Sequence, residues 1–439
     1  MPNLHFPDWT SLSPDQRGEE AQRCRARLAE LGTRLNAVVS VAAPPAGAFA
    51  SGTAPLGGLP YVAKDMFDRV GRHAGWGGVR PQGPSPAASA EILNRLDAAG
   101  AVEVAVSTMT ELAYEPSGYN GVRGRTLNPW HPDVVSGGSS SGSAALVAAG
   151  AAVLGLGSDT GGSVRIPASC CGVTGLKPTH GAVPDSGSMA LAPSLDTVGI
   201  FARSAAELQL VWPVVSGAAP ADERPVTTAV VLAEWIQEAT PGVRRAAEAG
   251  IEALRAAGVA IGSVGSTGGV DEIDRHTLLV MQAESARAHR PAAYPDGRLS
   301  PSLRRRLTKG EEIGEAALAD SLGQRPRLLA GFLDWIGEAD VALLPVLPFE
   351  TPLASQADPE NPAFEPRVLY RMSSFTRFVN LLGLPALSLP CGFDQRGVPI
   401  GLQIIGRRHR ERQLLALAAR VQAVSDWHGR IPPALSQAG

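Results

Sequence analysis

The sequence lacks an excess of charge of either sign. Its 39 Lys and Arg residues nearly balance 42 Asp and Glu residues, which leaves a formal net charge of -3 over 439 residues. A broad basic face that would bind the phosphates of nucleic acid or of anionic lipid is therefore not indicated. We expect no direct nucleic-acid partner.

The sequence also lacks the cysteine patterns of metal sites and disulfide-rich proteins. Cys24, Cys170, Cys171 and Cys391 form no Cys-x-x-Cys pair, and no His stands at zinc-ligand spacing. We therefore expect no metal, no cofactor and a reducing, cytoplasmic location. The first nine residues contain neither a basic n-region nor an apolar h-region, so no secretion or import signal is expected.

Long apolar runs are missing as well. Residues 137–158 carry no charge, but their first third is rich in Ser and Gly. The apolar run at 144–156 is too short to span a bilayer, so we expect no membrane contact.

The pattern that is present is an alternation of strands and helices. Gly and Pro are frequent, at 49 and 36 residues, which predicts many tight turns. Between 205 and 335 the periodicity is helical. Strands are predicted at 59–63, 101–106, 151–156, 341–345, 387–390 and 401–406, and helices at 16–35, 89–99, 143–149, 243–257 and 326–336. This alternation is typical of α/β proteins.

Two loops concentrate small polar residues, at 136–143 and 158–165. Consecutive glycines let backbone N–H groups converge on an oxyanion or a phosphate. No Lys follows either loop, which counts against a phosphate loop. Residues 138–142 also match G-x-S-x-G with Ser140 at the centre, the pattern of an α/β-hydrolase esterase. That pattern needs a strand directly before it and a later acid and His, and no histidine has such a signature.

Several motifs occur together in the remaining core sequence. Lys64-Asp65 ends a short apolar strand, and 137–145 reads GGSSSGSAA, 157–168 reads GSDTGGSVRIPA, and 171–179 reads CGVTGLKPT. The series continues with residues 194–199, SLDTVG, and with the segments 383–386 and 401–406. In order, spacing and content this set resembles the amidase signature family, strongly over 55–205 and 335–420.

The resemblance implies a fold and a catalytic triad. The fold is a single large mixed β-sheet covered by helices on both faces, in one domain over 1–439. Within it we expect a signature core at 55–205, a peripheral helical substrate-specificity region at 205–335, and C-terminal core strands and a helix at 335–425. The triad implied is Ser163 as nucleophile, Ser139 as bridging cis-serine and Lys64 as base.

This chemistry makes a physical demand on Lys64. A free lysine titrates near pH 10.4, so only about one in 2,500 is neutral at pH 7. Lowering its pKa by about three units takes roughly 4 kcal/mol, which desolvation of a buried lysine can supply. We therefore expect Lys64 to be buried, with Asp65 on the opposite face of the strand.

Other site residues follow from the same resemblance. The backbone N–H groups of Thr160, Gly161 and Gly162 are the expected oxyanion hole. Arg165 is expected either to pair with Asp159 or to meet an acidic substrate. The residues expected around the substrate are Met109, Tyr114, Ser140 and Arg165, and further candidates for a carboxylate or ureido substrate are Tyr294, Arg298, Arg304, Arg371, Arg377 and Asn380.

Two positions depart from the family pattern. Ser141 stands where the family usually has Gly, which predicts an extra polar contact after the cis-serine. The stretch 73–78, HAGWGG, replaces the usual Gly-Ser pattern and alters the expected pocket rim near Trp76.

Three functions remain open. The first is a stand-alone amidohydrolase of a small carboxamide or urea-type compound, acting alone, as a homodimer or with a small accessory subunit. The second is the glutaminase (A) chain of a glutamyl-tRNA amidotransferase, against which Ser141 and the short 205–335 region speak. The third is a non-catalytic binding or scaffold protein, which the joint presence of Lys64, Ser139 and Ser163 opposes.

Overall fold

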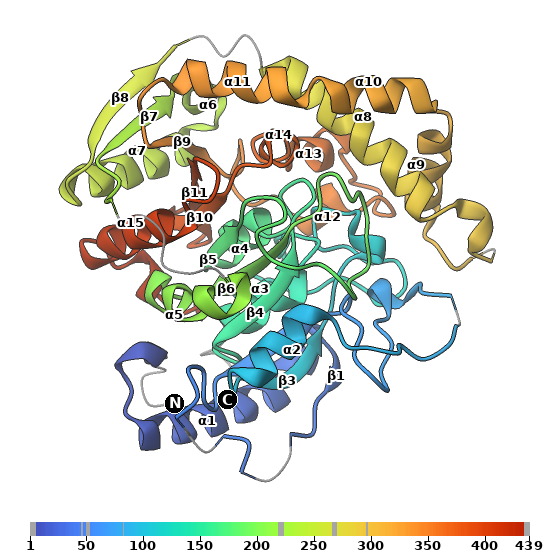
Figure 1. Ribbon diagram of the computed structural model, residues 1–439, viewed down its shortest axis with the longest axis vertical. Helices are drawn as coiled ribbons and strands as arrows, with labels where there is room; N and C mark the ends of the chain where they lie inside the picture. The colour runs from blue at the N-terminus through green and yellow to red at the C-terminus, as the bar shows by residue number, and fades with distance from the viewer. Residues whose placement is uncertain are drawn as a thin grey trace.

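The computed structural model describes residues 6–44, 47–49, 53–81, 83–217, 224–265, 270–295 and 297–433. Within these residues one mixed sheet of eleven strands runs through the whole molecule (Figure 1). Its strand order is β1-β3-β2-β4-β6-β5-β10-β11-β9-β7-β8. The strands are β1 Val38–Val41, β2 Pro60–Lys64, β3 Val102–Ser107, β4 Leu154–Ser158, β5 Thr174–Lys177, β6 Val198–Ala202, β7 Thr228–Leu232, β8 Ala260–Val264, β9 Val341–Pro345, β10 Ala386–Phe393 and β11 Pro399–Gly406.

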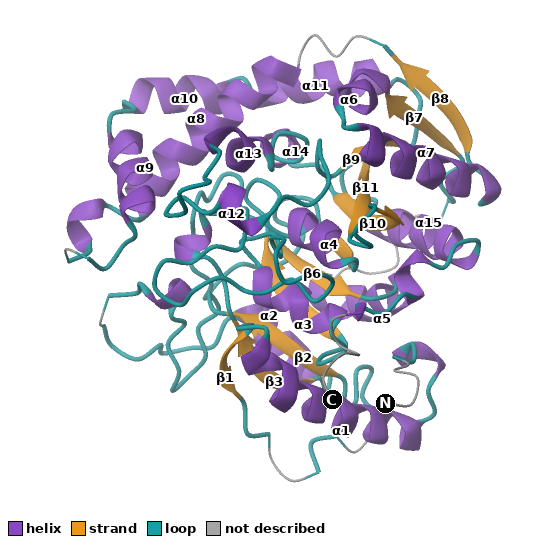
Figure 2. Ribbon diagram, turned by 180° about the vertical axis from the view of Figure 1, so that it is seen from behind, coloured by secondary structure: helices purple, strands orange, loops and turns teal. Residues whose placement is uncertain are grey.

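Helices surround this sheet (Figure 2). They are α1 Pro14–Arg34, α2 Glu91–Ala98, α3 Ser141–Ala148, α4 Arg165–Cys171, α5 Ala205–Ser216, α6 Ala233–Glu238, α7 Pro241–Ala256, α8 Val270–Ala288, α9 Pro301–Glu311, α10 Glu315–Gly323, α11 Arg325–Ile336, α12 Ala354–Ala357, α13 Pro366–Arg371, α14 Phe378–Leu382 and α15 Glu411–Ala423. Short 3-10 turns occur at η1 Trp9–Ser11, η2 Trp76–Gly78, η3 Glu111–Ala113, η4 Pro291–Ala293 and η5 Trp427–Gly429. No described helix is long and apolar enough to cross a bilayer.

The sheet is covered on both faces, as the side-chain alternation of β2 demonstrates. Tyr61 and Ala63 pack into the large core that includes residues of α2 and α5. Val62, which points the other way, packs into a second core with residues of α1 and α3. Successive strand residues face opposite sides of a sheet, so the two cores lie on opposite faces. The predicted α/β fold with helices on both faces is confirmed.

Local sequence signals account for several helix ends. Ser13 and Ser204 cap α1 and α5, each in a reciprocal capping box with the residue three positions on, Gln16 and Glu207. Helix α2 ends before Gly100, which has a φ of 84°, a conformation that glycine adopts without strain. These are ordinary signals, and the predicted helices at 16–35 and 89–99 are confirmed within a few residues.

Three neighbouring strands determine where the chemistry sits. Strand β2 pairs in parallel with both β3 and β4. Parallel neighbours end at the same edge of the sheet, so Lys64, Ser107 and Ser158, their last residues, come together there. Side chains at the carboxyl ends of such strands are well placed to form a site.

The region 205–335 is not purely helical, although its periodicity predicts helices. It contributes β7 and β8, which extend the sheet in parallel beyond β9. Both strands are only five residues long, and β8 lies at the edge of the sheet, where it is mostly exposed. A short strand with little burial leaves almost no alternating pattern in the sequence. Helices α8 to α11 do form a peripheral layer (Figure 1).

Two glycines on strands test how tightly the sheet packs beneath the catalytic loops. A methyl group on Gly157 would lie 2.7 Å from Ser140 Oγ and 2.8 Å from the ring of Phe201, whereas at Gly262 the nearest such atom is 3.7 Å away. We expect Gly157→Ala to lower the free energy of unfolding by about 1–3 kcal/mol, and Gly262→Ala to cause no loss. Urea unfolding of both variants measures this, and equal effects would contradict it.

Candidate active site

The side chain of Lys64 lies at the centre of the site and is 1% exposed. Its Nζ donates to Ser139 Oγ and to Ser158 Oγ, both at 2.8 Å. Lys64 shares a strand face with Val62, and so points toward the loop that precedes α3. The predicted neighbours Lys64 and Ser139 are thus in direct contact. Ser158 had no predicted role, although its place at the end of β4 was a usable signal.

The loop that carries Ser139 is fixed by backbone contacts on both sides. The peptide bond between Gly138 and Ser139 is cis. Gly138 N–H donates to Pro116 O at 2.7 Å, and Thr110 N–H donates to Ser139 O at 3.2 Å. A methyl group on Gly138 would lie 2.6 Å from Glu115 O, so only glycine fits there. Ser139 is fully buried, and its position is set by these contacts within the protein.

Ser163 lies between β4 and α4 and is 8% exposed, the most accessible member of the predicted triad. Its hydroxyl has no hydrogen-bond partner among the described residues. Its carbonyl accepts a hydrogen bond from Ser140 N–H at 3.4 Å, which ties the two serine loops together. Before it, Gly162 has a φ of 129°, and a Cβ there would collide with the side chain of Thr376. The sharp turn at Gly162 exposes the hydroxyl that follows it.

A buried ion pair supports the Ser163 loop from below. Arg165 and Asp159 are both fully buried, and Arg165 Nη2 donates to Asp159 Oδ1 at 2.7 Å. Burial alone would raise the pKa of Asp159, but the adjacent Arg165 guanidinium holds that pKa well below its usual range. The Asp159 carboxylate also accepts from the N–H groups of Gly162 at 2.8 Å and Val164 at 3.1 Å.

This ion pair corrects two expectations from the sequence. Of the two roles expected for Arg165, the structure has the pairing with Asp159. The remaining donors of Arg165 bind Thr376 O, Gln403 Oε1 and Asn380 Oδ1, which leaves none for a substrate. Gly162 N–H is engaged with Asp159, which counts against its expected part in the oxyanion hole.

The other expected oxyanion donors, unlike Gly162 N–H, are not engaged in hydrogen bonds with the part of the chain that the structure describes. Within the described residues the N–H groups of Thr160 and Gly161 have no acceptor, and the same holds for Ser163 N–H. The Thr160 hydroxyl donates to Asp196 Oδ1 at 2.6 Å, and Gly161 O accepts from Thr376 Oγ1 at 2.7 Å. The loop is thus held through its side chain and carbonyl while these N–H groups stay available.

The electrostatic surroundings of Lys64 favour a neutral amine. Burial lowers the pKa of Lys64 to about 7, while the carboxylates of Asp196 and Asp159 act in the opposite direction. A lysine that acts as a base near pH 7 needs its pKa lowered by about three units through burial, and the pKa of Lys64 is lowered by burial to about 7. Asp65 faces away, as expected, and its Oδ1 accepts from Gly75 N–H at 2.6 Å, next to η2.

Ser140 has a structural place in the loop. It is fully buried, its hydroxyl donates to Ser158 O at 3.2 Å, and it accepts from Ser158 N–H at 3.3 Å. A loop rather than a strand precedes it, and α3 begins at the next residue. These contacts count against both the substrate contact and the esterase nucleophile considered for Ser140. Ser141 makes the extra polar contact expected of it, with Thr126 Oγ1 at 3.0 Å.

A cavity of about 290 Å³ lies against the Ser163 loop, because Arg377 and Met281, two of its lining residues, are the side chains nearest to Gly161. Tyr114 lines it, whereas Met109 is 1% exposed within the main core and does not. Its lining residues are Tyr114, Pro116, Leu278, Met281, Gln282, Arg306, Lys309, Leu369, Tyr370, Ser373 and Arg377. Arg306 and Met281 were missed, because helical periodicity alone does not say which face of a peripheral helix meets a cavity.

Most of the further arginine candidates have structural partners instead. Arg304 donates to the carbonyls of Pro291 and Tyr294, and Arg371 pairs with Glu238. The side chain of Asn380 bonds Asp159. Of the six candidates only Arg377 lines the cavity.

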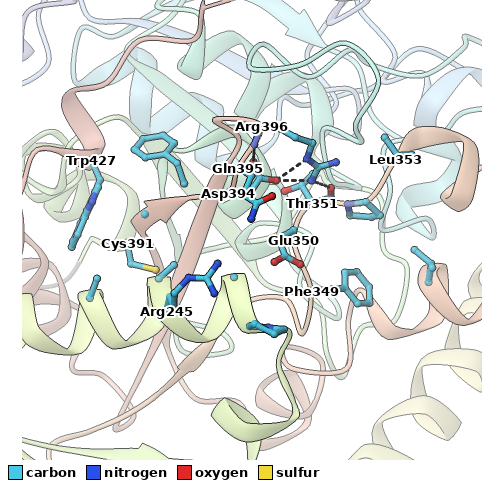
Figure 3. A pocket seen from close by; sticks show the side chains of 18 of the residues that line it. Arg245, Phe349, Glu350, Thr351, Leu353, Cys391, Asp394, Gln395, Arg396 and Trp427 are labelled. Carbon is cyan, nitrogen blue, oxygen red and sulfur yellow. Dashed lines mark hydrogen bonds and ion pairs between the residues drawn. The ribbon is translucent and has the colours of Figure 1, made fainter.

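A larger groove, of about 950 Å³, lies elsewhere, between α7, the segment after β9 and the β10–β11 turn (Figure 3). Like the smaller cavity, it is not lined by Lys64, Ser139 or Ser163, and none of its lining residues is among those nearest to Gly161. In this groove Arg396 binds Asp394 and Thr351 O (Figure 3). Glu350 accepts from the Thr240 hydroxyl. Size alone therefore does not mark the reactive site. Among the described residues no cluster of His, Cys, Asp and Glu suits a metal ion.

Comparison with known proteins agrees with this geometry. A family model described as Amidase matches residues 21–415. The A chain of the glutamyl-tRNA(Gln) amidotransferase of Deinococcus radiodurans is 35% identical over 446 residues, covering 90% of this chain and 92% of that protein. The chain belongs to the amidase family, and the predicted enzyme class, acting on amide C–N bonds, is confirmed.

Solved structures agree as well. The structure of 6-aminohexanoate cyclic dimer hydrolase in complex with its substrate matches with a TM-score of 0.83 at 25% identity, over 95% of this chain and 96% of that chain. The A chain of the glutamyl-tRNA(Gln) amidotransferase of Thermotoga maritima matches with a TM-score of 0.82 at 26% identity, over 98% and 97%.

The scaffold role of Arg165 is testable by stability. Arg165→Met leaves the Asp159 carboxylate buried without its counter-ion, so we expect a loss of about 3–5 kcal/mol in the free energy of unfolding. The control is Arg371→Met, whose exposed pair with Glu238 is worth no more than about 1 kcal/mol. Unchanged stability of Arg165→Met together with weakened substrate binding would restore the substrate role.

The titration of Lys64 is testable by a pH profile. If neutral Lys64 is the active form, the rate constant for modification of Ser163 rises with pH and levels off above about 7. The Asp196 carboxylate raises the pKa of Lys64, so Asp196→Asn should move the midpoint to lower pH. Asp271→Asn, an exposed change on α8, is the control. A midpoint near 10, or one unmoved in Asp196→Asn, would contradict the assignment.

Proposed function

We propose that the protein is an amidohydrolase that cleaves a small carboxamide or a urea-type C–N bond through an acyl-enzyme on Ser163. The observation that carries this proposal is the 2.8 Å hydrogen bond between Lys64 Nζ and Ser139 Oγ, inside a pocket that lowers the pKa of the lysine to about 7. A lysine that is neutral in about half of the molecules at pH 7 is a competent base.

In the first step, Ser163 Oγ attacks the carbonyl carbon of the substrate. Its proton passes to Ser139 Oγ while the proton of Ser139 passes to Lys64 Nζ, because a hydroxyl can accept and donate at once. Lys64 then returns a proton through Ser139 to the leaving nitrogen, which departs as ammonia or an amine. Water releases the acid in the reverse order of proton transfers. Ser158 supports the base by fixing the amine on its second side.

The oxyanion of the tetrahedral intermediate needs N–H donors that are not already used. The N–H groups of Thr160, Gly161 and Ser163, which have no acceptor among the described residues, meet that requirement, while Gly162 maintains the loop through Asp159. Asp159 and Arg165 act here as positioning residues, since they hold the loop without facing the substrate.

The proposal also covers the substrate, the cofactor, the cellular location and the partners. The substrate is a small-molecule amide, and no cofactor takes part in the proposed steps. Operation in a reducing cytoplasm suits four cysteines that are all free and buried. A homodimer or a small accessory subunit completes the set of proposed partners.

A second candidate function is the glutaminase chain of a glutamyl-tRNA amidotransferase. The observation in its favour is the 35% identity to such a protein over 90% of this chain. The same triad would then release ammonia from glutamine for a partner protein. This candidate requires glutamine to be a good substrate and a partner chain to purify with the protein.

The nucleophile is tested by intact-mass analysis after treatment with a serine-reactive fluorophosphonate. We expect one adduct on the wild-type protein, retained in Ser140→Ala and lost in Ser163→Ala, because Ser163 is the proposed nucleophile and is more exposed than Ser139 and Ser140. Release of ammonia from a panel of small amides, ureas and glutamine then measures turnover. Loss of the adduct only in Ser140→Ala would overturn the triad, and no adduct on a folded wild type would favour a non-catalytic role.

A further inference from the structure

The cavity lined by Tyr114 and Arg306 adjoins both reactive loops. A methyl group on Gly161 would lie 3.3 Å from Arg377 Cβ and 3.7 Å from Met281 Sδ, two lining residues. On the other side, the carbonyl of the lining residue Pro116 accepts the N–H of Gly138 in the cis-serine loop. The cavity, which residues of α8, α9 and α13 line, thus lies against both serine loops, and we place in it the acyl chain of a substrate bound at Ser163.

The charges around the cavity are of one sign. Arg306, Lys309 and Arg377 line it, and none of its described lining residues is Asp or Glu. Asp274, behind the wall, binds Arg377 through both of its oxygens at 2.5 Å. Glu115 lies 3.4 Å from Arg306 and forms an ion pair with it. Lys309 is exposed and forms no ion pair among the described residues, so the cavity keeps a positive excess.

Arg306 has hydrogen-bonding capacity to spare. Its side chain is 16% exposed, and its guanidinium lies 5.5 Å from the ring of Tyr114 and 5.3 Å from that of Tyr370. Nη1 donates to Tyr114 O at 3.2 Å, but the buried Nε–H has no acceptor among the described residues. The guanidinium itself lines the cavity and is partly exposed there, so it can bind an anionic oxygen of a ligand.

The rest of the wall is apolar and the volume is small. Leu278, Met281 and Leu369 supply carbon surface, and about 290 Å³ lies at the lower end of the range for ligand sites, roughly 300–1,000 Å³. A short hydrocarbon chain with a terminal carboxylate fits both the surface and the charge. An ammonium group on that chain would meet the positive excess that Lys309 contributes and no lining carboxylate among the described residues.

We propose that the substrate is a small primary amide whose acyl chain ends in a carboxylate and carries no ammonium group. The inference rests on the proposed amidohydrolase function and specifies its substrate class. The reaction is amide plus water giving a dicarboxylate and ammonia. Arg306 and Lys309 are the specificity-determining residues, and both act on the end of the substrate remote from Ser163.

Three matched amides test this class. Glutaramate carries the carboxylate, pentanamide replaces it with a methyl group, and glutamine adds an ammonium group to glutaramate. We expect kcat/KM for ammonia release to be at least about tenfold higher for glutaramate than for either of the others, since one well-placed charge contact is worth that much. Equal or higher values for pentanamide or glutamine would overturn the proposal, and a preference for glutamine would favour the amidotransferase reading.

Variants locate the effect within the cavity. Lys309→Glu should lower kcat/KM for glutaramate roughly tenfold and leave pentanamide within about twofold, by simple charge reversal. Arg305→Glu is the matched control, because it makes the same change in charge on an exposed position of α9 that does not line the cavity. Arg306→Lys keeps the charge beside Glu115 but replaces the planar guanidinium with an ammonium group, and should also weaken glutaramate selectively.

A binding measurement separates this inference from the proposed function. Calorimetric titration of Ser163→Ala with the three amides needs no turnover, and we expect glutaramate to bind at least about tenfold more tightly than the others. If the fluorophosphonate fails to label Ser163 but this preference holds, the catalytic proposal falls and the cavity assignment stands. If labelling succeeds and no preference appears, or if Lys309→Glu and Arg305→Glu behave alike, the cavity assignment falls.

Discussion

The buried ion pair between Asp159 and Arg165 is the interaction on which the reactive geometry depends. It joins the loop after β4 to residues more than 200 positions later, through Thr376, Asn380 and Gln403. Two charges taken out of water are tolerated only when nearly every donor and acceptor is used, and here the carboxylate also holds two backbone N–H groups. Because the buried pair needs all of these hydrogen bonds, they hold the Ser163 turn in one position.

Burial makes the ion pair between Asp159 and Arg165 costly to form. Burial also lowers the pKa of Lys64, which allows this lysine to act as the proposed base. Desolvation lowers the pKa of the Lys64 amine to about 7, because it outweighs the attraction of Asp196 and Asp159. Were either carboxylate in direct contact with the amine, the lysine would stay protonated and could not accept a proton. The structure avoids this by giving Lys64 two hydroxyl partners and giving the carboxylates other donors, the Thr160 hydroxyl for Asp196 and Arg165 for Asp159.

The motifs made the central residues of the site predictable. The remaining features depend on individual hydrogen bonds and on short strands, which no sequence pattern reveals. Lys64 and Ser139 could be placed in contact because the resemblance to the amidase signature family implies that both belong to its triad. The use of Gly162 N–H by Asp159 was not predictable, since no sequence pattern states which of three adjacent N–H groups a carboxylate binds. Ser140 matched a nucleophile pattern, yet its hydroxyl binds the backbone of Ser158. Strands β7 and β8 were missed because short, half-exposed strands lack a clear period.

In the proposed assignment, the central sheet and its loops hold the catalytic residues, and peripheral helices hold the residues that select the substrate. The proposed triad residues lie at the end of β2 and in the loops that β4, α3 and α4 hold rigid, where a shift of one side chain would disturb the sheet. The cavity wall comes mostly from α8, α9 and α13, which pack on the outside of the molecule. Lys309 touches none of the proposed catalytic residues, so in the proposed assignment its replacement would alter which amide is accepted and leave the cleavage steps in place. The proposal thus assigns the choice of substrate to the charges around the cavity and the cleavage to the triad.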